Sequence, residues 1–141
     1  MRILMFHVDH FSSTVTEKGR SKVVEEPQSK TVEVDEALLV LASVERQDEV
    51  SPEDVSGKAV DEISKLVYQL KTSAIVLHPF AHLFAEMSSP ETALKVMKLT
   101  EEGLNQRGFR VVRTPFGWFN TLELKAKGHP LSRVARTISS G

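Results

Sequence analysis

The sequence predicts a single α/β domain, built on a mixed β-sheet with two main helices. Its 141 residues suit one domain with its own hydrophobic core. Two helix-start signals each precede a segment with helical apolar periodicity, and short apolar runs of strand length lie before, between and after them. No internal repeat or low-complexity segment interrupts this pattern. We therefore treat residues 1–141 as one domain.

The first part of the chain is expected to supply the early strands. Residues 1–11 are rich in Ile, Leu, Phe and Val and predict a first strand. Residues 12–30 are polar and contain Gly19 and Pro27, which suits a hairpin partner followed by an exposed loop. Residues 34–45 are too apolar for an edge strand and predict a central strand, with a buried helix as the alternative.

Both helices are predicted from their starts. Ser51-Pro52-Glu53 offers an N-cap serine, a proline at the first helical position and an acid near the free N–H groups. Apolar residues then recur at steps of three and four as far as Leu70. Ser89-Pro90-Glu91 repeats the signal, and this helix is expected to run to Arg107 and to end at Gly108.

Further strands are expected around the second helix. Residues 73–77 form a short apolar run between the two helices, and residues 109–113 and 121–127 alternate in the manner of strands. Residues 130–138 fit either a last strand or a short helix. The sheet is therefore expected to gain strands from both ends of the chain.

Composition excludes several classes of function. The chain has no cysteine, which removes disulfides, thiolate metal sites and cysteine nucleophiles. No apolar run approaches the roughly 20 residues of a membrane helix, and the first residues do not resemble a signal peptide, so we expect a cytoplasmic protein. Charge is uneven, because residues 107–141 carry seven lysines and arginines against one acid, Glu123. Such a run is typical of a solvated face or of a surface that meets phosphates.

The segment HPFAHL, residues 78–83, places two histidines four residues apart after an apolar run. With His7, Asp9 and His10 as further ligands, His78 and His82 could form a metal site. The alternative is a histidine that closes a strand and is hydrogen-bonded to the backbone. Pro79 argues against a helix that would bring both imidazoles to one face.

Two turns hold aromatic side chains beside a proline, residues 79–82 and 115–119. Binding residues often lie in such turns, although core packing explains each aromatic residue equally well. Gly117 stands between Phe116 and Trp118 and could mark a close approach of the backbone to a ligand. No G-x-S-x-G turn or glycine-rich phosphate loop is present, so no side-chain nucleophile is evident.

Several motifs together resemble a known family. The start MRILMFHVDH, the strand LLVLASVE, the turn HPFAHL, the run RGFRVVRTPFGWF and the segment KGHPL resemble, in this order, the N-terminal editing domain of archaeal threonyl-tRNA synthetases. The resemblance covers nearly the whole chain. It implies a fold like that of the D-aminoacyl-tRNA deacylases, a homodimer, and hydrolysis of serine wrongly attached to threonine tRNA, with threonyl-tRNA spared and no metal or other cofactor.

The resemblance also implies how the reaction proceeds and which residues take part. Water attacks the ester with help from the 2′-hydroxyl of the terminal adenosine, while main-chain groups hold the substrate. His82 matches the site histidine that positions the substrate, and His78 is expected to be structural. The main chain around Val44 and Glu45 is expected to bind the aminoacyl group, and the turns at Ala81 and at Phe116 and Gly117 are expected to wall the pocket. The other residues expected to bind the substrate are Phe119, Asn120 and Arg133.

Three of these positions depart from the family pattern. Phe119, Asn120 and Arg133 stand where tyrosine, lysine and glutamate are expected. The alternative functions are therefore a non-catalytic tRNA-binding module of the same fold, and a metal-dependent hydrolase that uses the histidines. The segment 137–141 resembles the start of a linker, so a synthetase catalytic domain is an expected partner, either in the same chain or in a separate one. The basic run is expected to face tRNA phosphates.

Overall fold

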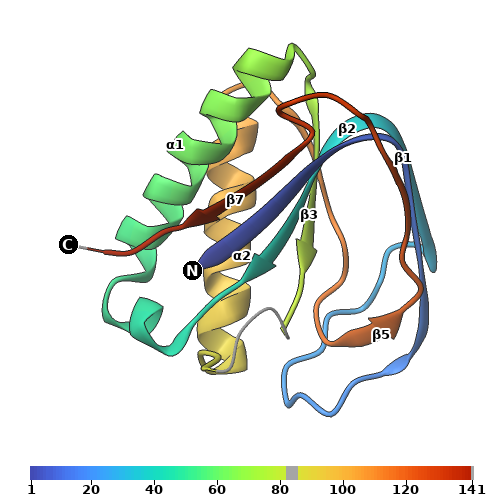
Figure 1. The fold of residues 1–141 in the computed structure, drawn as a ribbon. Coiled ribbons are helices and arrows are strands. Elements are labelled where there is room, and N and C mark those ends of the chain that lie inside the picture. The colour runs from blue at the N-terminus through green and yellow to red at the C-terminus, as the bar shows by residue number, and fades with distance from the viewer. Residues whose placement is uncertain (82–85, 141) are drawn as a thin grey trace.

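A computed structural model describes residues 1–81 and 86–140. Within them the chain forms one α/β domain with a mixed sheet and two long helices, as the sequence predicts (Figure 1). In chain order the elements are β1 (Arg2–Lys18), β2 (Thr31–Ser43), the 3-10 helix η1 (Arg46–Val50), α1 (Pro52–Leu70), β3 (Ala74–Pro79), α2 (Pro90–Gln106), β4 (Arg110–Arg113), β5 (Trp118–Asn120), β6 (Glu123–Ala126) and β7 (Arg133–Thr137).

The long strand β1 organises the sheet. The strand order is β4-β3-β2-β1-β5, and β6 and β7 also pair with β1. One edge of β1 is antiparallel to β2, and its other edge is paired in turn by β7, β6 and β5. The strands β2, β3 and β4 are parallel to one another. Their carboxyl ends therefore lie at the same edge of the sheet.

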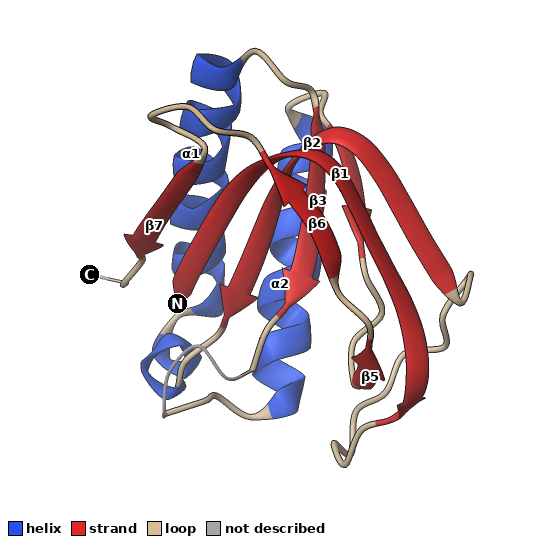
Figure 2. Cartoon of the chain, turned by 45° about the vertical axis from the view of Figure 1, so that its right-hand side comes forward, coloured by secondary structure: helices blue, strands red, loops and turns tan. Residues whose placement is uncertain are grey.

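Both helices cover one face of this sheet (Figure 2). The chain passes from β2 through α1 to β3, and then through α2 to β4, moving twice in the same direction. Right-handed crossovers in one direction place both helices on the same side. The main core fills the space between the helices and the sheet, and a second cluster lies on the opposite face. Members of this second cluster include Phe11, Leu39 and Val76, with Leu4 and Phe6 partly buried beside them.

The prediction for the start of the chain is wrong in one respect. Residues 12–18 continue β1, and the hairpin partner of β1 is β2. The polar residues of this stretch gave no strand signal because the far end of β1 is largely exposed at Thr16, Glu17 and Lys18. Pairing with β2 and β5 keeps the segment extended nevertheless.

Most of the other predicted elements are confirmed. The predicted central strand, residues 34–45, is confirmed as β2, which starts earlier and ends at Ser43, and the last segment forms the strand β7 rather than a helix. The sequence does not predict the short strand β5, because Trp118 and Phe119 belong to the aromatic turn 115–119. Ser89 caps α2 by accepting a hydrogen bond from the Thr92 N–H at 3.2 Å, whereas the Ser51 side chain makes no cap hydrogen bond.

Candidate functional site

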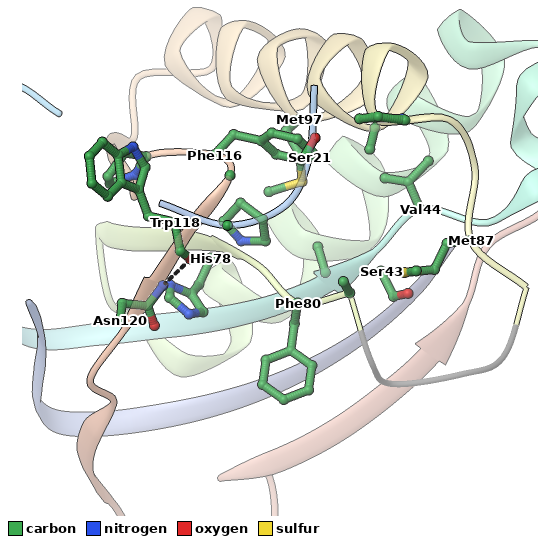
Figure 3. A pocket seen from close by; sticks show the side chains of 18 of the residues that line it. Ser21, Ser43, Val44, His78, Phe80, Met87, Met97, Phe116, Trp118 and Asn120 are labelled. Atoms are coloured by element: carbon green, nitrogen blue, oxygen red, sulfur yellow. Dashed lines mark hydrogen bonds between the residues drawn. The ribbon is translucent and has the colours of Figure 1, made fainter. Parts of the chain in front are cut away.

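A pocket of about 740 Å³ opens at the carboxyl ends of the three parallel strands (Figure 3). Ligands of open α/β sheets commonly bind in this position. The end of β2 contributes residues 42–44, the end of β3 contributes 78–81, and the turn after β4 contributes 115–117. The lining is mainly apolar, with aromatic rings at Phe80, Phe116 and Trp118.

One wall of the pocket is a loop fastened to the turn after β4. The Gly19 N–H donates to the Gly117 carbonyl at 2.7 Å, and the Phe116 N–H donates to Glu25 Oε1 at 3.0 Å. The Trp118 indole N–H donates to the Glu25 carbonyl at 2.6 Å. Through these bonds the loop holds Arg20 and Ser21 against the pocket although they lie far away in sequence.

The Glu25 side chain completes this attachment. Its carboxylate pairs with both terminal nitrogens of the Arg113 guanidinium, which also donates to Glu101 at 2.9 Å. Burial works against ionisation of Glu25, but the hydrogen bonds from Arg113 and from the Phe116 N–H outweigh it and hold the pKa of the carboxyl below its ordinary value. Glu25 is therefore a charged anchor for the wall of the pocket.

Gly117 has a structural reason for being glycine. Its φ is +90°, a conformation that other residues rarely adopt. A Cβ atom at this position would lie 2.6 Å from the Val23 carbonyl oxygen and 3.0 Å from the Val24 Cα. The sequence indicated a close backbone approach here, and the structure shows that the loop itself makes that approach.

The pocket gathers six of the residues expected to bind a substrate. Those that line it are Val44, Ala81, Phe116, Gly117, Phe119 and Asn120. Phe119 is 52% exposed, and the Asn120 amide donates to the Trp118 carbonyl at 3.3 Å. His82, expected to position the substrate, lies outside the described residues.

Glu45 and Arg133 are not among the lining residues. The Glu45 carboxylate is buried and lies 3.5 Å from the amino group of Met1 and 3.2 Å from Arg2 Nε. Arg133 lies on β7, where it is opposite Phe6 of β1. A role for the Arg133 side chain therefore depends on groups that reach beyond this pocket, whereas the role expected of Glu45 belongs to its main chain.

Sequence reasoning did not find the other wall of the pocket. Met87 lies beside Val44, and the first turns of α2 contribute Pro90, Ala93 and Met97. These apolar residues have the spacing of any helix that packs on a sheet, so no sequence signal separates them from the core. Arg20 and Ser21 were also missed, because nothing in the sequence brings their loop to the turn after β4.

His78 combines a structural contact with a place in the pocket. The residue is 2% exposed, and its ring packs edge-on against Phe11 at a centroid distance of 5.9 Å and places Nδ1 2.8 Å from Thr114 Oγ1. Burial lowers the pKa of His78 to about 4, so the ring is neutral at neutral pH. The expected structural role is present, but the same side chain also lines the pocket.

The proposed metal ligands do not converge in the described residues. His7 is in register with Leu38 of β2, and through it with Ile75 of β3. His78 lies three residues beyond Ile75, so alternation places it on the opposite face of the sheet. Instead, His7 is hydrogen-bonded to Glu36 at 2.6 Å and to His129 at 2.9 Å. No group of three or more potential ligands is found in the part of the chain that the structure describes.

Comparison with known proteins decides the family. A family described as the archaea-specific editing domain of threonyl-tRNA synthetase matches residues 1–138. The chain belongs to this family. Similar proteins include threonine–tRNA ligases of Methanocaldococcus jannaschii, 44% identical over 98% of this chain, and of Thermococcus sibiricus, 43% identical over 100% of it. A third, from Methanopyrus kandleri, is 42% identical over 99% of this chain.

These relatives are much longer than the editing domain. The chain spans 22% of the length of the M. jannaschii protein, 23% of the T. sibiricus protein and 22% of the M. kandleri protein. The described helices of the editing domain contain none that is long and apolar enough to cross a membrane.

The basic run of the editing domain is partly neutralised by internal ion pairs. Arg107 pairs with Asp61, Arg113 with Glu25 and Glu101, Lys127 with Asp9 and Glu36, and Arg136 with Glu62. No ion pair is found for Arg110, Lys125 and Arg133 among the described residues. The expectation that this run faces phosphates therefore concerns chiefly these three cations.

No serine of the pocket is arranged as an activated nucleophile in the described part of the editing domain. Ser21 Oγ accepts from the Val23 N–H, and Ser88 Oγ donates to the Ser89 carbonyl. Ser43 is the third serine of the lining. Among the described residues, none of the three hydroxyls is hydrogen-bonded to a histidine or a carboxylate, which nucleophilic catalysis by serine requires. None of these described serines is thus arranged to form a covalent intermediate.

Proposed function

We propose that this domain hydrolyses the ester that links serine to threonine tRNA and leaves threonyl-tRNA intact. The observation that carries the proposal is the mainly apolar pocket at the strand ends, in a chain of the editing-domain family. Threonine exceeds serine by one methyl group, and a single site can use such a difference for only about 1–3 kcal/mol of discrimination. A second, hydrolytic site is the usual remedy.

Backbone and apolar groups can provide the second selection. Val44, Ala81 and Gly117 bring main chain close to the cavity from three different strand ends. A serine side chain fits in this space, whereas the extra methyl group of threonine would collide with the walls. Discrimination of this kind depends on the shape of the pocket and requires no specialised catalytic side chain.

The chemistry is assigned to water and to the RNA. We infer that the 2′-hydroxyl of the terminal adenosine assists the attacking water, that main-chain groups hold the aminoacyl end, and that His82 and Asn120 help to position it. The proposal includes no metal or other cofactor. The absence of an activated serine in the described pocket is consistent with this division of labour.

A deacylation assay tests the proposal. The domain is incubated with threonine tRNA charged either with serine or with threonine, and the loss of each amino acid is followed over time. We expect rapid loss of serine and no enzyme-dependent loss of threonine. Binding of both charged tRNAs without hydrolysis would instead support the non-catalytic tRNA-binding module.

A chelation control addresses the metal-dependent hydrolase. His7 and His78 lie on opposite sheet faces, so one ion cannot bridge them without rearrangement. Activity should persist after exhaustive treatment with a chelator. A loss that added zinc restores would contradict the metal-free mechanism.

We further propose that the domain is a cytoplasmic homodimer that works with a synthetase catalytic domain, in the same chain or in another. The second apolar cluster lies on the sheet face that neither α1 nor α2 covers. The central members of this cluster are already buried within one chain, so a second copy would cover the partly buried side chains at its margin, such as Leu4, Phe6 and Val112. Sedimentation analysis should give a dimer, and Val112→Lys, at the edge of this cluster, should weaken it. A monomer at micromolar concentration would contradict the proposal.

A further inference from the structure

His78 is held in a defined orientation by its surroundings. It lies near the end of β3 in register with Leu41, on the sheet face that carries the second apolar cluster. Phe11 packs against the ring, and Thr114 Oγ1 lies 2.8 Å from Nδ1. The Thr114 N–H in turn donates to the Leu77 carbonyl at 3.0 Å, which fixes Thr114 beside the strand. The position of the imidazole is thus set before any ligand binds.

The second ring nitrogen, Nε2, is the atom of His78 that is left free for a ligand. It has no hydrogen-bond partner in the described part of the chain. Nε2 is not fully buried either. Among the described residues, the one side-chain polar atom that is both fully buried and without a hydrogen-bond partner is Ser64 Oγ. His78 is one of the residues that line the pocket, so a ligand held there can approach its ring. In Figure 3, His78 and Asn120 lie at the end of the pocket away from Val44 and Met87.

The charge of the ring limits what it can bind. Burial lowers the pKa of His78 to about 4, which leaves a neutral imidazole at neutral pH. A neutral imidazole carries one N–H donor and one acceptor nitrogen, and Thr114 Oγ1 can take either role toward Nδ1. Nε2 can therefore meet an uncharged group, such as a hydroxyl or a nucleobase nitrogen. A phosphate would gain no ion pair here.

We propose that His78 is a substrate-positioning residue, which hydrogen-bonds through Nε2 to an uncharged group of the aminoacyl-adenosine end of the tRNA. This inference rests on the proposed editing function and adds to it a residue that the sequence assigned to structure alone. In a mainly apolar pocket, one fixed polar group strongly favours one orientation of the ligand. Any other orientation would leave that group without a hydrogen-bond partner, which costs binding free energy.

Two substitutions separate the structural contact from the proposed one. In His78→Asn the side-chain amide falls near the place of Nδ1, so the Thr114 contact can persist while nothing reaches the pocket. In His78→Gln the amide extends to the place of Nε2, so the pocket contact can persist while the Thr114 contact is lost. The probe is adenosine with serine in a non-hydrolysable amide linkage at the 3′ position, and its affinity is measured by calorimetry.

The proposal predicts opposite effects on stability and affinity. His78→Asn should keep most of the thermal stability and bind the analogue about tenfold more weakly. His78→Gln should be less stable yet bind more tightly than His78→Asn. Wild-type affinity in His78→Asn, or equal losses of affinity in both variants, would overturn the proposal.

A measurement on the wild-type protein covers the case in which a variant fails to fold. Nitrogen-15 NMR of the His78 ring should show a shift of the Nε2 resonance when the analogue is added, with a smaller change at Nδ1. An Nε2 resonance that does not respond to saturating analogue would overturn the proposal. If wild-type protein hydrolyses seryl-tRNA in that case, the editing function stands and only the role of His78 fails. If it neither binds the analogue nor hydrolyses seryl-tRNA, both fail.

Discussion

At the scale of single residues, the pocket contains two groups whose chemistry depends on a contact far away in sequence. Gly117 is glycine because the backbone at Val23 and Val24 occupies the space of a side chain. His78 is neutral because strand packing removes it from water. The sequence singled out both positions from their neighbours. It could not identify Thr114 and Phe11 as the contacts of His78, or the loop as the close neighbour of Gly117, since the fold brings these partners together.

The buried imidazole predicts a loss of stability in mild acid. The ordinary pKa of 6.5 applies to the unfolded chain, and burial lowers the folded-state pKa to about 4. Between these values the unfolded state binds more protons, so stability falls as the pH drops. Between pH 7 and pH 4.5 this group should cost roughly 2–3 kcal/mol of unfolding free energy.

Urea denaturation at these two pH values checks the effect. His78→Asn removes the titrating group, so the variant should lose less stability than wild-type protein on acidification. Other carboxylates titrate in both proteins and cancel in the comparison. Identical losses would show that His78 is protonated equally in the folded and unfolded states.

Two glycines provide a matched pair of substitutions. Gly117→Ala should destabilise the domain by about 1–3 kcal/mol, because its φ is +90° and a Cβ would lie 2.6 Å from the Val23 carbonyl oxygen. Gly57 lies within α1, and nothing lies within 4 Å of a Cβ added there. Gly57→Ala should therefore stabilise by about 1 kcal/mol through helix propensity. Thermal denaturation of both variants measures the difference, and changes of the same sign would contradict it.

At the scale of elements, the sequence predicted the helices and strands that are determined by their own residues. The starts of α1 and α2, the central strand β2 and the strand β3 each have a signal in a few consecutive residues. The far end of β1 and the strand β5 have none, because pairing with distant segments keeps them extended. The wall of the pocket formed by the loop after β1 was missed for the same reason. Its place depends on Glu25 and Arg113, which are 88 residues apart.

Removal of the Glu25 charge should release this wall. Glu25→Gln cannot form the charged pair with Arg113 and leaves that arginine, whose side chain is 11% exposed, with Glu101 as its one remaining carboxylate partner among the described residues. We expect a loss of about 1–3 kcal/mol in unfolding free energy and faster hydrogen exchange at the Gly19 amide. Hydrolysis of seryl-tRNA should fall as well, since Arg20 and Ser21 line the pocket from this loop.

The neighbouring acid supplies a control for this prediction. Glu26 is exposed, and Glu26→Gln removes the same charge from the same loop without touching Arg113. It should leave stability and exchange nearly unchanged. Equal effects of the two substitutions would mean that general charge in the loop, rather than the Glu25–Arg113 pair, holds the wall in place.

At the scale of the whole molecule, the parallel strands bring three separate sequence motifs to one cavity. The residues after β2, β3 and β4 meet there because the carboxyl ends of these strands share one edge of the sheet. Sequence alone could predict that these turns mattered, but not that the first turns of α2 close the space between them. The three family departures, Phe119, Asn120 and Arg133, are also separated: the first two line the pocket and Arg133 does not.

The positions of Asn120 and Arg133 predict that the tRNA, and not a side chain of the protein, supplies the catalytic group. Asn120 carries no basic group, and Arg133 lies on β7 outside the pocket lining. If backbone and RNA perform the chemistry, Asn120→Ala and Arg133→Ala should each slow seryl-tRNA hydrolysis by less than the roughly hundredfold typical of losing a general base. A tRNA whose terminal adenosine lacks the 2′-hydroxyl, with serine on the 3′-oxygen, should be nearly inert. Single-turnover rates with the normal and 2′-deoxy substrates give the comparison, and rapid hydrolysis of the 2′-deoxy substrate would transfer the catalytic role to a protein side chain, with His82 and His7 as the first to test.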